Sequence, residues 1–201
     1  MPPAPVAYID LKIPDPIVQG IYDTIYDEYA PKQGQGKVQR SKGFVIDPNY
    51  RDCKIVDVHA QHWFVGMIWH HIMRTNQHNF QYDILSFDND QIQFISYEQG
   101  GHYSWHLDDL GYIHENVIPK SLLKTENITE FQRKLSFSLL LNDNYEGGEL
   151  QVLHQPKTLY RVPKQKGRLF IFDARCNHRV TKVKSGRRDV LVGWVVGPRW
   201  K

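Results

Sequence analysis

Two side chains that commonly bind metals stand two residues apart near the middle of the chain. The segment from Tyr97 to Asp109 reads YEQGGHYSWHLDD and contains His106 and Asp108. Residues i and i+2 of an extended chain point to the same side, so this imidazole and carboxylate are expected side by side. His178 follows a predicted strand over 168–172 and is well placed on a neighbouring strand. The spacing therefore predicts a metal site formed by His106, Asp108 and His178.

The ligand types indicate which metal this site would hold. Two histidines and one carboxylate on one face of a metal leave about three positions open, which suits non-haem Fe(II) binding a cosubstrate and oxygen together. Structural zinc favours a closed, cysteine-rich shell, and the chain has only two cysteines, Cys53 and Cys176. Catalytic zinc is the weaker alternative. Asp109 lies on the opposite strand face from Asp108 and is excluded as a ligand.

An arginine ten residues beyond His178 is a second candidate for the site. On the extended segment that leads into the strand predicted over 190–196, Arg188 shares one face with large apolar residues, namely Val190, Val192 and Trp194. We therefore expect Arg188 to point inward. A buried arginine needs an anionic partner, and its planar fork suits a carboxylate. That partner is either a ligand or an internal Asp or Glu.

The first part of the chain carries helical patterns that would support the site. Asp15 is a predicted N-cap with Pro16 at the first helical position, and apolar residues then recur at helical spacing over 16–29. A second helix, expected to be the longest, is predicted over about 60–79. The basic, glycine-containing stretch 32–43 is predicted to be a mobile surface loop. We interpret the histidines around the second helix as structural: His59, His62, His70, His71 and His78.

After Asp83 the pattern changes to that of a β-protein. Strands are predicted over 91–95, 135–141, 149–154, 158–162, 168–172 and 190–196. Turn signals separate them and no helical pattern lies between the later ones, which favours an antiparallel sandwich or barrel over βαβ units. The long segment 110–132 is the predicted lid or substrate loop, together with 32–43.

Composition limits the class of protein. The chain has 201 residues, 41% hydrophobic and 23% charged, as expected of one compact globular domain. The 25 Lys and Arg against 22 Asp and Glu give a net charge of +3, too balanced for a dedicated DNA-binding domain. Few cysteines, and the lack of a recognisable signal peptide or membrane span, predict a reducing, cytoplasmic location.

Several motifs occur in an order that resembles one family. They are Tyr97-x-x-Gly100-x-x-Tyr103-x-x-His106-x-Asp108, then Arg133-Lys134-Leu135-Ser136 leading to Leu141-Asn142-Asp143 and Tyr145-Glu146-Gly147-Gly148-Glu149-Leu150, and finally His178 with Arg188 and Trp194. Over about residues 90–197 the chain resembles the Fe(II)- and 2-oxoglutarate-dependent oxygenases. Within these it is most similar to the prolyl-4-hydroxylase-like branch, which includes bacterial and phage-encoded members.

The resemblance implies a fold and a set of roles. The fold is α+β and mainly β: a double-stranded β-helix, or jelly roll, over about 86–201, with helical support over about 1–85, in a single domain 1–201. Iron would be held by the His106, Asp108 and His178 set. Arg188 would pair with the distal carboxylate of 2-oxoglutarate, and Tyr97 would donate its hydroxyl to it. Tyr103 lines that pocket, stacks beneath it or is an ordinary core tyrosine.

The resemblance also implies a reaction. The enzyme would hydroxylate an aliphatic C–H, with a prolyl residue of a peptide or protein as the first choice, and consume O2 while releasing succinate and CO2. Ascorbate is an admissible additional cofactor. Open alternatives are a free amino acid, a small metabolite, a nucleic acid or a non-catalytic binding module. Nucleic-acid demethylases usually carry a second arginine on the last strands, where this chain has only Arg199. Arg133 has no predicted role, and Glu149 is expected to hydrogen-bond within its turn.

Overall fold

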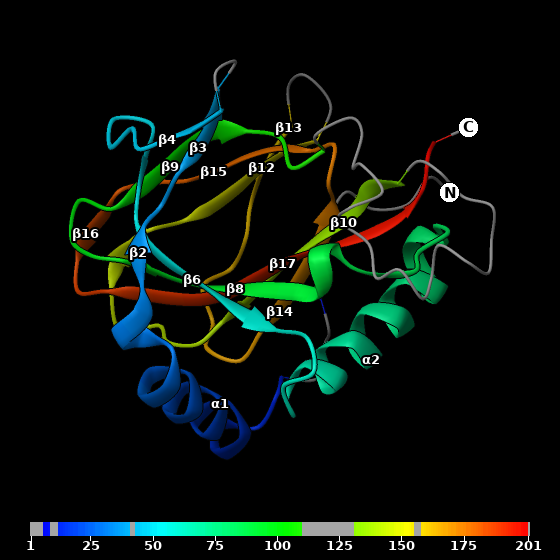
Figure 1. Ribbon diagram of the computed structural model, residues 1–201, viewed down its shortest axis with the longest axis horizontal. Helices are drawn as coiled ribbons and strands as arrows, with labels where there is room; N and C mark the ends of the chain where they lie inside the picture. Colours follow the sequence, from blue (N-terminus) through cyan, green and yellow to red (C-terminus); the bar gives the residue numbers. More distant parts are fainter. Residues whose placement is uncertain (1–5, 9–11, 41–42, 110–130, 155–157, 201) are drawn as a thin grey trace.

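The structure is a computed structural model that describes residues 6–8, 12–40, 43–109, 131–154 and 158–200. Its main helices are α1, Asp15–Glu28, and α2, Val65–Thr75. Helix α2 continues into a π-helical turn, Asn76–Phe80, and short 3-10 turns lie at Ala30–Lys32 and Asp88–Asp90. Both helices lie on one side of a large sheet, and a smaller sheet lies on the other (Figure 1).

The large sheet has eight strands among the described residues. Seven follow the order β1, β14, β10, β17, β8, β6, β2, and β7 pairs with β17. In that order their bounds are Val6–Tyr8, Leu169–Asp173, Phe131–Leu140, Arg188–Pro198, Gln91–Tyr97, Lys54–His59 and Gly34–Gln35, with β7 at Ser86–Phe87.

The smaller sheet carries the strands that face the large one. Its order is β13, β12, β15, β9, β5, with bounds Thr158–Arg161, Leu150–His154, Asn177–Val180, His102–His106 and Arg51–Asp52. Two further antiparallel pairs complete the described strands: β11, Glu146–Gly147, with β16, Val183–Ser185, and β3, Val38–Arg40, with β4, Gly43–Val45. The pairings within both sheets are antiparallel, and all six predicted strands are present.

The core has two parts because the large sheet is covered on both faces. In β14, Leu169 and Ile171 pack with the helices, whereas Phe170 and Phe172 pack between the sheets. Successive side chains of a strand point to opposite faces, so a strand covered on both sides must be apolar throughout. This explains the apolar run of β14, and it places the space between the two sheets on the same face as Val190 and Arg188.

Two details of the predicted helices are wrong. Asp15 is the first helical residue rather than the N-cap, and its carboxylate accepts from Lys12 Nζ at 2.7 Å instead of capping a backbone N–H. The second helix begins at Val65 rather than near residue 60, although with its π-helical turn it runs to Phe80 and is the longest helical segment of the described residues. The reason is that His59 still belongs to strand β6, and Ala60 N donates to Asp90 O as the chain turns out of the sheet.

The first 85 residues are not helical support alone. The predicted loop 32–43 contains β2 and β3, and β6 pairs with β8 along its whole length, so this region extends the large sheet. β5 likewise joins the smaller sheet beside β9. Their periodic patterns are only two to six residues long, too short for the sequence to reveal. Most of the predicted lid 110–132 lies outside the described residues.

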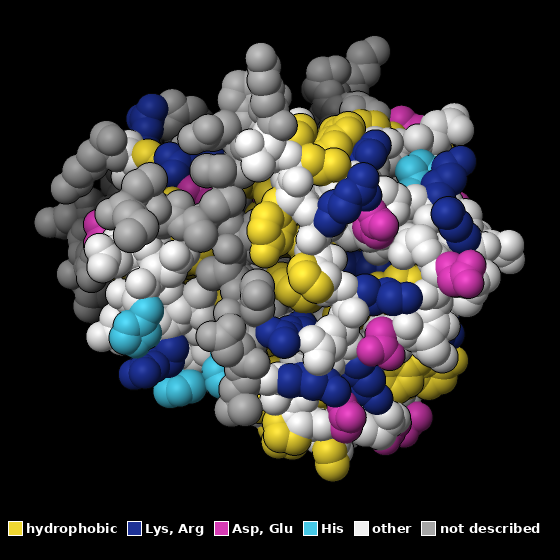
Figure 2. Space-filling view, turned by 180° about the vertical axis from the view of Figure 1, so that it is seen from behind, with side chains coloured by type: hydrophobic (Ala, Val, Ile, Leu, Met, Phe, Trp, Pro, Cys, Tyr) yellow, Lys and Arg dark blue, Asp and Glu magenta, His cyan; other side chains and the backbone are white. Residues whose placement is uncertain are grey.

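The hydropathy of the helices and the charge of one face of the surface can be compared with the composition. No helix among the described residues is long and apolar enough to cross a membrane. Figure 2 shows Lys and Arg side chains mixed with Asp and Glu on the face seen there. That face therefore does not form the surface of one charge sign that a nucleic-acid-binding protein typically presents.

Candidate active site

The three predicted metal-binding residues lie together between the sheets. His106 ends β9, and His178 lies directly opposite it on the paired strand β15. The two imidazole rings are 4.1 Å apart between centroids, and one ligand atom from each of His106, Asp108 and His178 lies within 4.8 Å of the others. Antiparallel pairing thus brings together two histidines that are far apart in the sequence.

Asp108 reaches this site although it lies beyond the end of its strand. The backbone N–H groups of Asp108 and Asp109 both donate to Ala174 O, at 3.2 and 3.1 Å. This turn keeps the Asp108 carboxylate on the side of the imidazoles: Oδ1 lies 3.7 Å from His106 Nε2, and Oδ2 lies 3.2 Å from His178 Nε2. The predicted relation between residues i and i+2 holds because of a turn rather than a continuous strand.

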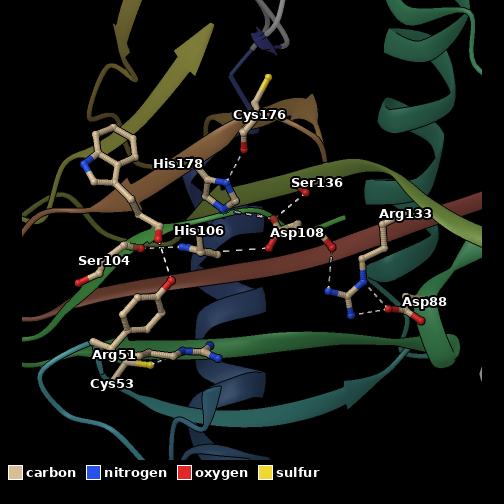
Figure 3. A network of polar contacts seen from close by, with 12 residues as sticks. Arg51, Cys53, Asp88, Ser104, His106, Asp108, Arg133, Ser136, Cys176 and His178 are labelled. Atoms are coloured by element: carbon tan, nitrogen blue, oxygen red, sulfur yellow. Dashed lines mark hydrogen bonds and ion pairs between the residues drawn. The ribbon is translucent and has the colours of Figure 1, made fainter. Parts of the chain in front are cut away.

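Backbone carbonyls select the tautomer of both histidines. His106 Nδ1 lies 2.8 Å from Ser104 O, and His178 Nδ1 lies 3.0 Å from Cys176 O (Figure 3). Because a carbonyl oxygen only accepts, each Nδ1 must carry the proton, which leaves the Nε2 lone pair facing Asp108. Histidines that ligate a metal commonly show this second hydrogen bond. The donor set therefore fits a divalent transition metal.

Electrostatics favour an ionised carboxylate beside the two imidazoles. Burial, followed by His178, lowers the pKa of His106 to about 3. Burial would also lower the pKa of His178, but the Asp108 carboxylate outweighs it and raises that pKa. Burial opposes ionisation of Asp108, yet His178, His106 and Arg133 together hold its pKa below the usual range. The carboxylate is thus available as an anionic ligand at neutral pH.

A polar network supports Asp108 from behind. Ser136 Oγ donates to Asp108 Oδ2 at 2.7 Å, and both side chains are buried. Arg133 donates from Nε to Asp88 Oδ2 at 2.6 Å and from Nη1 to the Asp108 carbonyl at 3.4 Å. Its guanidinium also lies 3.9 Å from the centre of the Trp194 ring. Arg133, whose role the sequence left open, therefore links Asp108 to Asp88 and Trp194.

Arg188 points into the space between the sheets, as its strand parity predicts. It is 3% exposed, and its Nε has no hydrogen-bond partner among the described residues. Arg188 lines a cavity of about 50 Å³ that also contains the three candidate ligands, and an adjoining space of about 330 Å³ beside Tyr145. No ion pair joins it to an internal Asp or Glu of the described chain. A buried guanidinium that has an unpaired Nε and no anionic partner among the described residues fits an anionic ligand.

The two predicted tyrosines have different surroundings. Tyr97 is buried directly opposite Arg188 in the β8–β17 pairing, with the guanidinium 5.3 Å from its ring centre. Tyr103 stacks on His106 at 3.5 Å between centroids and lines the same cavity. Burial first, against the opposing charge of Arg51, raises the pKa of Tyr103 to about 12, so its hydroxyl stays protonated. Both tyrosines can donate a hydrogen bond within the cavity.

The Gly147-Gly148 turn borders the adjoining space. Gly148 has φ +58°, and a Cβ there would lie 3.2 Å from Arg188 Cδ, so glycine lets this turn approach Arg188 closely. Glu149 does not bond within the turn. Its carboxylate accepts instead from Arg161 at 2.6 Å and from Gln151 at 2.7 Å, on the adjacent strands.

Sequence reasoning missed Ser136 and Arg51, which both line the cavity. Ser136 has a weak signal, because it is a polar residue inside an apolar strand and lies in a motif already quoted. Arg51 has none: it belongs to β5 and reaches the site only through the pairing of β5 with β9. The histidines interpreted as structural lie outside the cavity lining.

Comparison with known proteins agrees with this geometry. The family described as "2OG-Fe(II) oxygenase superfamily" matches residues 92–196. A PKHD-type hydroxylase of Crocosphaera subtropica is 31% identical over 106 residues, which are 52% of this chain and 41% of the relative. The matched region thus spans less than half of that curated relative.

Solved structures confirm the jelly-roll fold. A prolyl-4-hydroxylase of Pseudomonas putida superimposes with a TM-score of 0.70 at 16% identity, covering 98% of this chain and 94% of its own. A prolyl hydroxylase of Trichoplax adhaerens, in complex with a peptide fragment of the hypoxia inducible factor oxygen degradation domain, gives a TM-score of 0.70 at 16% identity. That match covers 95% of this chain and 83% of the other.

Proposed function

The chain belongs to the 2OG-Fe(II) oxygenase superfamily, and from this membership we propose that it hydroxylates an aliphatic C–H bond, with a prolyl residue of a peptide or protein as the substrate. One observation carries the proposal. Two imidazole Nε2 atoms and one ionised carboxylate converge in a cavity whose wall also holds Arg188, a buried guanidinium without an anionic partner.

In this proposal the residues of the site bind the metal and the cosubstrate and orient them. His106, Asp108 and His178 hold Fe(II), and Ser136 and Arg133 keep the carboxylate in place. Arg188 pairs with the distal carboxylate of 2-oxoglutarate, and the buried hydroxyl of Tyr97 is a further donor to it. When bound, the metal and cosubstrate supply the oxidising chemistry: one atom of O2 enters the substrate as hydroxyl, the other enters succinate, and CO2 is released.

The cavity walls are largely apolar. Apolar side chains of both sheets surround the candidate ligands, among them Leu150, Phe172 and Val180. An apolar lining strengthens the pairing of Arg188 with a carboxylate and limits side reactions. The Nδ1 hydrogen bonds of both histidines direct Nε2 toward the metal site, and the ionised Asp108 supplies the anionic ligand.

The choice of substrate has indirect support. The matched relative is named as a PKHD-type hydroxylase, and the Trichoplax neighbour was solved with a peptide bound. The donor set is complete in this chain, which favours an enzyme over a binding module that has lost a ligand.

A succinate-release screen tests the proposal. The purified protein is incubated with Fe(II), 2-oxoglutarate, ascorbate and O2, together with prolyl peptides, free amino acids or oligonucleotides. We expect succinate above the uncoupled level with prolyl peptides, and background succinate in His106→Ala. The exposed histidine variant His70→Ala, outside the site, should retain turnover. Unchanged turnover in His106→Ala, or turnover with oligonucleotides alone, would contradict the proposal.

A binding measurement separates the cosubstrate from catalysis. Under anaerobic conditions Fe(II) and 2-oxoglutarate should give a weak visible charge-transfer band. Arg188→Met should raise the 2-oxoglutarate concentration needed for half of this band by about tenfold or more, because a charge-assisted pair is lost. An unchanged titration in this variant would remove Arg188 from the cosubstrate site.

A further inference from the structure

A second guanidinium lies in the wall of the metal-site cavity. Arg51 begins β5, and the β5–β9 pairing places it opposite Tyr103. Its guanidinium is 4.6 Å from the centre of the Tyr103 ring, and that ring stacks on His106 at 3.5 Å. One aromatic ring therefore separates Arg51 from a candidate metal ligand.

The partners of Arg51 are neutral. Nε donates to Cys53 Sγ at 3.2 Å, and Nη1 donates to the Lys37 carbonyl at 3.1 Å. No ion pair with a carboxylate of the described residues involves Arg51, although it is only 8% exposed. Neither bond uses Nη2, which leaves that group free to meet a ligand in the cavity.

The position of this side chain is fixed before any ligand binds. Gly36 N donates to Cys53 O at 2.8 Å, and a Cβ on Gly36 would lie 3.1 Å from Arg51 Nε and 2.7 Å from Cys53 Sγ. The backbone of residue 36 thus packs directly against the Arg51–Cys53 pair. A guanidinium held in this way loses little freedom on binding an anion.

The charges of the cavity do not balance without an additional anion. Its lining holds two guanidinium groups, Arg51 and Arg188, against one carboxylate, Asp108. Fe(II) and the 2-oxoglutarate dianion cancel each other, so one positive charge remains. Arg188 pairs with the cosubstrate in the proposed function, which leaves Arg51 as the buried cation without a counter-ion. Such a charge is costly to bury unpaired.

We propose that Arg51 binds a carboxylate of the substrate. This inference rests on the proposed function and narrows its substrate class to molecules with a carboxylate close to the carbon that is hydroxylated, because Arg51 is only one ring away from His106. Two sources share this chemistry: the α-carboxylate of the target residue itself, or the acidic side chain of a residue next to it.

Matched probe pairs test this inference. The first pair is N-acetyl-L-proline and its amide, the second is the blocked dipeptides Pro-Glu and Pro-Gln, and the third is N-acetyl-L-leucine and its amide. Dissociation constants are measured under anaerobic conditions from the change that each probe causes in the charge-transfer band of the Fe(II)–2-oxoglutarate complex. Succinate release is measured separately in air.

The expected result is a preference that depends on Arg51. The wild-type protein should bind the carboxylate member of at least one pair about tenfold or more tightly than the amide, the scale of a charge-assisted hydrogen bond. Arg51→Gln should abolish this preference and leave binding of the amide member unchanged, whereas Arg51→Lys should keep part of it. The exposed Arg74→Gln is the matched control and should bind like the wild type.

Three outcomes are distinguishable. Equal binding of carboxylate and amide members in every pair overturns the inference, even if prolyl probes are hydroxylated. Equal loss of both members in Arg51→Gln, with a normal thermal melt, shows a structural role and overturns it as well. A carboxylate preference without hydroxylation of any prolyl probe supports Arg51 as the anion site while it contradicts the proposed prolyl substrate.

Discussion

At the scale of single residues, the site depends on which atoms are left free. In both histidines Nδ1 donates a hydrogen bond to the backbone carbonyl two residues earlier, so both Nε2 atoms face Asp108. Asp108 in turn is held by Ser136 from the neighbouring sheet. These hydrogen bonds fix the ligands before a metal arrives, which is how outer contacts of a metal site contribute to affinity.

Ser136 gives a residue-level prediction. Ser136→Ala removes the hydrogen bond to Asp108 Oδ2 and should weaken Fe(II) binding by roughly 10-fold to 100-fold, the range found for such outer contacts. An anaerobic metal titration measures this effect. Ser96→Ala is the control, since Ser96 is a buried serine on β8 that lies outside the cavity lining. Equal affinities in the two variants would show that Ser136 does not position the carboxylate.

At the scale of elements, strand pairing carries the geometry. β9 and β15 bring the histidines together, β8 and β17 place Tyr97 opposite Arg188, and β5 brings Arg51 to the edge of the smaller sheet. The end of β14 is tied down near the site, because Asp173 Oδ2 accepts from Tyr82 at 2.6 Å and from Arg175 at 2.6 Å. Ala174, next to it, supplies the carbonyl that turns Asp108 inward.

The Asp173 cluster predicts an acid-sensitive stability. Burial opposes ionisation of Asp173, but Arg175 and Tyr82 outweigh it and lower its pKa. A carboxyl with a lowered folded-state pKa stabilises the fold above its unfolded pKa of about 3.9, and this contribution is lost as the pH falls through the folded pKa. Asp173→Asn should therefore lower the melting temperature at pH 7, and the difference from wild type should shrink toward pH 3. The exposed Asp23→Asn serves as the control. A difference that stays constant with pH would contradict this assignment.

At the scale of the whole molecule, the large sheet separates the helices from the cavity. One face of the sheet packs against helical residues such as Ile21, Phe64 and Ile68. The other face lines the cavity. The helices therefore stabilise the sheet without contacting the ligands. Because both faces must be apolar, the few polar side chains that point into the cavity, such as Arg188 and Ser136, stand out as functional candidates.

Ligand binding should stabilise the whole fold. Fe(II) and 2-oxoglutarate bind the folded state only. A free ligand concentration of 100 times the dissociation constant therefore adds about 2.7 kcal/mol to the free energy of unfolding. For a chain of this size that raises the melting temperature by about 5–10 °C. Differential scanning fluorimetry under anaerobic conditions measures the shift. Asp108→Ala should lose the metal-dependent shift, whereas Asp109→Ala should keep it. The same shift in both variants would contradict the assigned ligand set.

The donor types, their order along the chain and the strand face on which Arg188 lies could all be predicted from the sequence. These properties depend on local spacing, since strand parity follows directly from the alternation of side chains. The turn that carries Asp108 onto Ala174, the pairing of His106 with His178 and the arrival of Arg51 beside Tyr103 were decided by the tertiary structure. Each of them depends on contacts between segments distant in the chain, which set strand register and sheet order, and no local pattern encodes these contacts.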